Sequence, residues 1–167
     1  RVGQVAPLAA VGGDAILQVP VLRWPCHDMP FSAHHGGFIS RAEYFDDNMF
    51  SISSLESYTI DPQHRVLLEV GYETMHSSHF RRPQLVGHET GIFVGIMNAD
   101  FASVSGIESV YAATGTQISI ASGRLAFALG TQGPCMTIDT ACSAALVALN
   151  SAMLNVCANN CEIALSG

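Results

Sequence analysis

The stretch "PCMTIDTACSAALVALNSAML", residues 134–154, joins two different hydrophobic patterns at one cysteine, Cys142. Residues 134–139 have the short apolar character of a buried strand. Residues 142–156 carry no charge, and we predict a helix that is buried on nearly all sides. The large apolar side chains of this predicted helix fall on one stripe: Leu146, Leu149 and Met153. The pattern therefore predicts a strand, a sharp turn that presents Cys142, and a buried helix.

The rest of the chain alternates predicted helices and strands. Asp61 and Pro62 are typical of a helix start, as N-cap and first helical residue. We expect that helix to end near residue 77, with Leu67, Val70 and Thr74 at helical spacing. A strand over 91–97, a helix over 113–130 and a strand over 162–167 follow, whereas residues 1–36 are expected to be irregular, with turns and extended chain. This alternation predicts an α/β fold built on a layered sheet.

Two glycines belong to the predicted 113–130 helix. Gly130 suits its C-terminal stop. Gly123 lies inside it and costs about 1 kcal/mol relative to alanine. We expect close packing against another backbone to be the reason for Gly123.

The composition excludes several classes of protein. Of the 167 residues, 49% are apolar and only 13% are charged, against about 25% charged in an average domain. So little charge suits a piece of a larger body or a chain with a large partner interface. The net charge of -7 argues against binding to nucleic acid or anionic membranes. No uncharged apolar run is long enough for a membrane span, and no signal peptide is visible.

The five cysteines do not form a recognisable framework. Their odd number and irregular spacing disfavour disulfides, and no second Cys or His pair completes a metal site with Cys157 and Cys161. The simplest interpretation is small buried side chains. For Cys142 a second interpretation stays open, because backbone N–H groups and the helix dipole at a helix start favour the nucleophilic thiolate. The same N–H groups can stabilise an oxyanion.

A family resemblance favours the second interpretation. "DTACSAALVAL" resembles the active-site signature of β-ketoacyl synthases of modular polyketide and type I fatty acid synthases, with Ala144 and Ala145 in place of two serines. Further segments resemble the family in the same order along the chain: "AILQVPVLRW", "GGFI", "IDPQHRVLLEVGYETM", "GIFVG", "TGTQISIASGRLAFALGTQGP" and "EIALSG".

The resemblance implies a thiolase-like layered fold (αβαβα), of which residues 1–167 would be most of the N-terminal half. The domain would then be partial and truncated at both ends. The family's His-Gly-Thr-Gly-Thr and Asn-x-Gly-His motifs, which carry its two catalytic histidines, are not in this sequence. His64 stands in the predicted 61–77 helix, where we expect a hydrogen-bonded or solvent-exposed structural residue. The pair His34 and His35 has no partner motif.

By the same resemblance, Cys142 is the residue that accepts the acyl group. The implied reaction is a decarboxylative Claisen condensation between this acyl thioester and a malonyl-type extender. The substrates arrive on the phosphopantetheine of an acyl carrier protein, and no cofactor or metal is bound directly. A homodimer is implied, in which residues 134–139 pair across the two-fold axis. The implied location is the cytoplasm, or a plastid if a transit peptide precedes the chain.

Three alternatives remain beside a polyketide ketosynthase. The first is the ketosynthase of a type I fatty acid synthase, which performs the same chemistry. The second is a non-catalytic ketosynthase-like subunit that shapes chain length, although such proteins usually replace the cysteine. The third, a thiolase or chalcone-type synthase, is disfavoured by "DTACS" and "DPQHR".

Overall fold

The computed structural model describes residues 10–21, 23, 34–39, 43–106 and 109–167. The chain divides into two compact units, residues 1–44 and 45–167. The first unit contains β1 (Ile16–Gln18) and β2 (His35–Gly37). The elements of the second unit are α2 (Ser54–Thr59), α3 (Pro62–Ser77), α4 (Arg82–Leu85), β3 (Thr90–Gly95), α5 (Phe101–Ser105), α6 (Ala112–Thr116), α7 (Ala121–Leu129), β4 (Cys135–Ile138), α8 (Ala144–Cys157) and β5 (Ile163–Ser166). Short 3₁₀ turns, Ile118–Ile120 and Ala141–Ser143, precede α7 and α8.

In the first unit, β1 and β2 pair antiparallel, with Ile16 opposite Gly37 and Gln18 opposite His35. Beyond the strands, the backbone N–H of Val19 donates to the carbonyl of His34. The expected extended chain is therefore present here, but its pairing into a two-stranded sheet was not predicted. Three-residue strands are too short to leave a periodic pattern among so many prolines and glycines.

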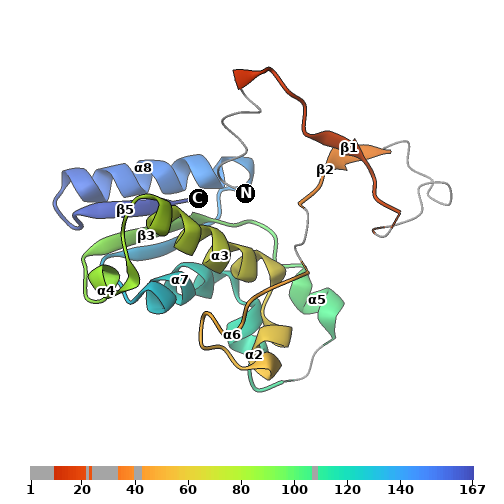
Figure 1. The fold of residues 1–167 in the computed structure, drawn as a ribbon, viewed down its shortest axis with the longest axis horizontal. Helices are drawn as coiled ribbons and strands as arrows, with labels where there is room; N and C mark the ends of the chain where they lie inside the picture. The colour runs from red at the N-terminus through yellow and green to blue at the C-terminus, as the bar shows by residue number, and fades with distance from the viewer. Residues whose placement is uncertain (1–9, 22, 24–33, 40–42, 107–108) are drawn as a thin grey trace. The chain divides into compact units, whose positions relative to one another are not determined.

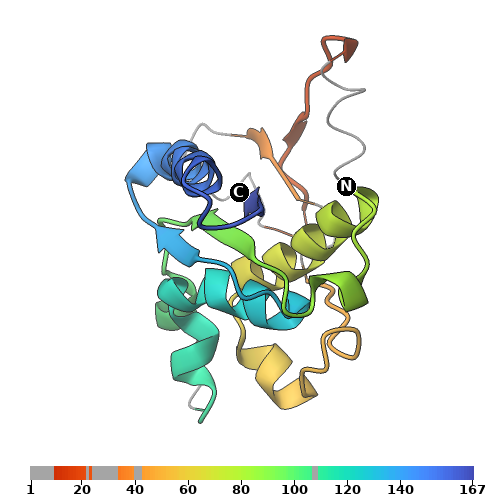
Figure 2. The same cartoon turned by 90° about the vertical axis from the view of Figure 1, so that its left-hand side faces the viewer.

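The second unit is built on a three-stranded parallel sheet in the order β4–β3–β5. Figure 1 shows α8 on one face of this sheet and α7 on the other, with α3 packed against α7. Figure 2 shows the same layers after a quarter turn. The predicted alternation of strands and helices is confirmed, because a parallel sheet requires a crossover between successive strands.

The central strand β3 is covered on both faces. Ile92, Val94 and Ile96 lie in the main core cluster together with residues of α3 and α7. Phe93 faces the other way and forms a second cluster with Ala148 and Ala152 of α8. This double cover explains why "GIFVG" is almost continuously apolar rather than alternating.

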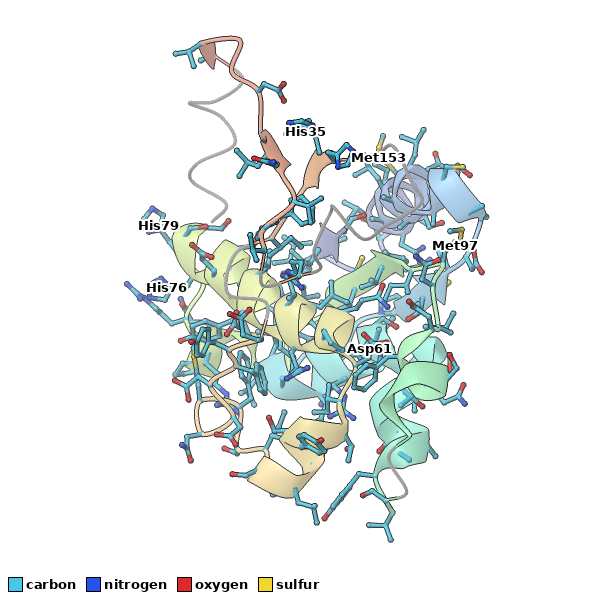
Figure 3. The ribbon with its side chains drawn as sticks, turned by 90° about the vertical axis from the view of Figure 1, so that its right-hand side faces the viewer. His35, Asp61, His76, His79, Met97 and Met153 are labelled. Carbon is cyan, nitrogen blue, oxygen red and sulfur yellow. The ribbon has the colours of Figure 1, made fainter. Side chains whose placement is uncertain are left out.

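Helix α3 begins as predicted. Asp61 is its N-cap and accepts a hydrogen bond from the backbone N–H of Gln63 at 2.8 Å; Figure 3 labels Asp61 at this end of the helix. Leu67, Val70 and Thr74 lie on the helix as their spacing predicts, and they are partly buried. The buried stripe of α3 lies beside them and is formed by His64, Leu68, Gly71 and Met75.

The predicted 113–130 helix is interrupted. The backbone leaves the helical region at Gln117 (φ -74°, ψ 116°), which separates α6 from the 3₁₀ turn and α7. Gly130 ends α7 in the left-handed region (φ 79°), as expected. The expectation for Gly123 is wrong, since a Cβ built there meets no atom of the described residues within 4 Å.

Helix α8 turns its small residues toward the sheet, which corrects the predicted burial. Ala144, Ala148 and Ala152 are its buried residues. The predicted stripe is exposed instead, by 69% at Leu146, 48% at Leu149 and 59% at Met153; Figure 3 labels Met153 on this outer side. The sheet surface under α8 presents the sequence Gly91, Phe93, Gly95, so alanines give the closest fit there.

Candidate active site

Cys142 follows β4 at the end of the sheet where the parallel strands finish. It lies in the middle of the 3₁₀ turn Ala141–Ser143, and its side chain is exposed. Helix α8 begins at Ala144, two residues later than predicted. The strand, turn and helix around Cys142 are therefore present as predicted, with the thiol just before the first turn of the α-helix.

The turn before the thiol has an unusual backbone. Ala141 has φ of 53°, which is the left-handed region that residues with a Cβ rarely adopt. The carboxylate of Asp139 accepts a hydrogen bond from the Ala141 N–H at 3.0 Å. The hydroxyl of Ser143 donates to the Thr140 carbonyl at 2.8 Å. These two local hydrogen bonds stabilise the sharp turn between β4 and α8.

The strand that leads to this turn is tied to α7. The Thr137 hydroxyl donates to Ser122 Oγ at 2.9 Å and accepts from the Ser122 backbone N–H at 3.2 Å. Ser122 is buried in the first turn of α7, where backbone N–H groups lack helical partners. This pair of hydrogen bonds fixes β4 against the second helical layer, two residues before Asp139.

His64 differs from both parts of its expectation. Its exposed fraction is 1%, and neither ring nitrogen has a hydrogen-bond partner among the residues that the structure describes. Burial lowers the pKa of His64, Asp61 opposes this shift, and the positive charge of Arg124 adds to it. The ring is therefore a neutral core residue, and its burial keeps it away from any substrate in solution.

His88 lies at the opposite end of the sheet from Cys142, because it precedes β3 whereas Cys142 follows β4. Its Nδ1 lies 2.9 Å from the Thr90 hydroxyl, and its Nε2 lies 3.2 Å from a carboxylate oxygen of Glu162. Figure 3 labels His76 and His79 at the C-terminal end of α3. His34 and His35 belong to the first unit, and His27 lies outside the described residues.

Among the described cysteines, the interpretation as small buried side chains is wrong for Cys135 and Cys157, which are exposed, and correct for Cys161. Cys142, for which the second interpretation was favoured, is exposed as well. Cys26 lies outside the described residues. Within the part of the chain that the structure describes, no group of three or more His, Cys, Asp or Glu could hold a metal ion. In the same part, no helix is long and apolar enough to cross a membrane.

Comparison with known proteins gives consistent matches. The family model "Beta-ketoacyl synthase, N-terminal domain" matches residues 10–167. The spectinabilin polyketide synthase system protein NorA' of Streptomyces orinoci is 42% identical over 161 residues, covering 93% of this chain and 4% of that protein. Erythronolide synthase EryA3 of Saccharopolyspora erythraea is 40% identical over 166 residues, covering 93% of this chain and 5% of that protein. The ketosynthase from module 6 of the bacillaene synthase from Bacillus subtilis 168 superposes with a TM-score of 0.85 at 27% identity, covering 99% of this chain and 28% of that one.

The layered parallel sheet and this structural neighbour define the class as a thiolase-like α/β domain. The chain belongs to the β-ketoacyl synthase family, in which it corresponds to the N-terminal domain of ketosynthases of modular polyketide synthases. Its predicted fold class and family are thereby confirmed. The chain spans about 5% of the curated relatives named above and 28% of the ketosynthase structure.

Sequence reasoning missed the residues that support the turn. Asp139 and Thr137 precede the thiol and Gly95 ends β3, but no pattern in their own residue types predicts these roles. The spacing of two glycines four residues apart in "GIFVG" was a usable signal, because strand glycines often mark the close approach of another backbone.

Proposed function

We propose that this chain carries the acyl-accepting cysteine of a polyketide ketosynthase, and that Cys142 is that residue. The observation that carries the proposal is the exposed thiol of Cys142 at a strand–turn–helix junction. Family membership supports the reaction class, and the "DTACS" signature supports the choice among the exposed thiols.

The proposed first step is a thioester exchange. The Cys142 sulfur attacks the carbonyl carbon of an acyl thioester on the phosphopantetheine of an acyl carrier protein. A new carbon–sulfur bond forms, and the old one breaks as the tetrahedral intermediate collapses. The proton of the Cys142 thiol ends on the released phosphopantetheine sulfur. Backbone N–H groups at the turn are the proposed oxyanion donors, a role that stabilises the intermediate electrostatically.

The proposed second step forms the carbon–carbon bond. A malonyl-type extender loses carbon dioxide, and its carbanion attacks the carbonyl carbon of the Cys142 thioester. The bond to the Cys142 sulfur breaks, which releases a β-ketoacyl product on the carrier and the Cys142 thiolate, and this thiolate takes a proton from water to restore the thiol. We propose that residues 1–167 act within a larger ketosynthase domain, which supplies the histidines that this step requires. This chain spans only a small part of the length of its relatives, which supports that proposal.

We further propose an acyl carrier protein and a second copy of the domain as partners. In the described sheet β4 is an edge strand, so its outer edge can pair with another strand. The proposed place of action is the cytoplasm, where carrier-bound acyl chains are made.

The test is transfer of a radiolabelled acyl group from a simple thioester to the full-length protein. We expect labelling of the wild type and its loss in Cys142→Ala. Cys135→Ala and Cys157→Ala are matched controls, because both thiols are exposed like Cys142. Equal labelling of Cys142→Ala and the wild type would contradict the assignment of the nucleophile.

A further inference from the structure

Gly95, the last residue of β3, lies directly under the start of α8. A Cβ built on Gly95 would lie 2.5 Å from the carbonyl carbon of Ala144 and 2.5 Å from the backbone nitrogen of Ala145. Real Cβ atoms do not approach other atoms so closely, and the two atoms met here are backbone atoms that cannot rotate away. The absence of a side chain at Gly95 is therefore what allows α8 to begin at this distance from the sheet.

The strand cannot retreat from this contact. The Gly95 N–H donates to the Gly167 carbonyl at 2.7 Å, and the N–H of Ile96 donates to the Ile138 carbonyl at 3.1 Å. Gly95 also stands opposite Ile138 in the parallel ladder with β4. Because hydrogen bonds hold β3 at this point on both sides, any added bulk at Gly95 must move the helix.

The first residue of α8, which would move, follows directly on the turn that carries the Cys142 thiol. Ala144 lies two residues after Cys142, and its backbone N–H donates to the Ala141 carbonyl to close the 3₁₀ turn. Ala144 is also buried against the sheet. A displacement of Ala144 is therefore passed directly to the turn that presents the sulfur.

We propose that Gly95 is a positioning residue for Cys142: its missing side chain sets the distance between β3 and the turn that carries the thiol. This inference rests on the proposed acyl transfer to Cys142. Nucleophilic attack depends on the placement of the sulfur relative to the thioester carbonyl and the oxyanion donors, and a shift of about 1 Å can cost about 100-fold in rate.

The chain offers two matched controls for Gly95→Ala. Gly91 is on the same strand and faces α8 as well, but its Cβ would meet side chains, Phe93 and Cys161, at the far end of the sheet. Gly133 is a control for backbone overlap, because its Cβ would lie 2.5 Å from the Thr90 carbonyl carbon, also at the far end. Both substitutions disturb packing without touching the turn at Cys142.

The experiment measures acyl transfer to Cys142 in the full-length protein, per folded molecule, with the folded fraction taken from circular dichroism. Alkylation of Cys135 and Cys157 by iodoacetamide, followed by peptide mass spectrometry, is the internal reference for general exposure. We expect Gly95→Ala to lower acyl transfer by about 100-fold while the reference alkylation rates stay unchanged. Gly91→Ala and Gly133→Ala should keep the wild-type rate per folded molecule.

A milder pair of variants keeps the test decisive if Gly95→Ala does not fold. Ala144→Gly removes one buried methyl group where α8 meets Gly95, and Ala152→Gly does the same on the same face two turns later. We expect a loss of about tenfold for Ala144→Gly and none for Ala152→Gly. A wild-type rate in folded Gly95→Ala, or in Ala144→Gly where Gly95→Ala is unfolded, would overturn the proposal. Labelling of Cys142→Ala would instead overturn the proposed function.

Discussion

The carboxylate of Asp139 accepts a hydrogen bond from the backbone N–H of Ala141 at 3.0 Å, one residue before the candidate nucleophile Cys142. Ala141 is held in the left-handed region, where a residue with a Cβ loses about 1–2 kcal/mol. The hydrogen bond offsets part of that cost, so the turn that exposes the thiol depends on a side chain in the preceding loop.

This relationship predicts different effects for two substitutions of Asp139. Asp139→Ala removes the acceptor, so we expect a loss of about 1 kcal/mol in the free energy of unfolding and slower acylation of Cys142. Asp139→Asn keeps an oxygen acceptor and should retain most of both properties. Urea denaturation and acyl-transfer rates measure the two effects. If the asparagine variant fails as badly as the alanine variant, the charge matters rather than the hydrogen bond.

The lowered pKa of the buried His64 leads to a specific pH dependence of stability. Burial lowers the pKa of His64 in the folded state, with Asp61 opposing and Arg124 reinforcing the shift. Below the unfolded pKa of about 6.5, the unfolded chain binds a proton that the folded chain does not. Stability is therefore complete above that pH and falls as the pH falls below it.

The variant His64→Gln isolates this effect. We expect its free energy of unfolding, measured in urea between pH 5 and 8, to fall less steeply with acid than that of the wild type. The difference in slope should approach but not exceed about 1.4 kcal/mol per pH unit, the value for one proton. Identical slopes for the two proteins would show that His64 protonates without a folding penalty.

Alanine substitutions at two helical glycines should change the stability of the protein in opposite directions. At Gly123 in α7 an added Cβ meets nothing within 4 Å, so Gly123→Ala should stabilise the protein by about 0.5–1 kcal/mol through helix propensity. At Gly71 in α3 the Cβ would lie 2.8 Å from two methyl carbons of Leu125, so Gly71→Ala should destabilise it by about 1–3 kcal/mol. Thermal unfolding measures both. A loss of stability at Gly123 would contradict the open space observed there.

Substitutions on the buried face and on the exposed face of α8 should differ in their effect on stability. Ala148 is fully buried and packs against Phe93, so Ala148→Leu should cost about 1–3 kcal/mol through overpacking. Leu146 is mostly exposed, so in this 167-residue chain Leu146→Ala should change the unfolding free energy by no more than about 0.5 kcal/mol. Denaturant unfolding of both variants tests the orientation of the helix. Comparable losses would mean that Leu146 is covered.

Much of the fold could be predicted because local chemistry specifies it. Asp61 and Pro62 start α3 where a cap and a fixed φ favour a helix start, and Gly130 ends α7 where a positive φ is needed. The strand–turn–helix at Cys142 was predicted because hydrophobic patterns of different period meet there. The break at Gln117 was not predicted, because nothing in its own side chain prevents a helix.

The amino-acid sequence alone predicts the three strands of the main sheet, their alternation with helices, the family and the residue that stands at the turn. It does so because caps, hydrophobic period and signature motifs act over a few residues. Which face of α8 is buried, the unpaired state of His64 and the clearance at Gly95 depend on atoms that are far apart in the chain. Alanine was a better fit than leucine against β3 only because two glycines and one phenylalanine shape that surface. Such contacts exist only after the strand and helix have packed, so the tertiary structure decides them.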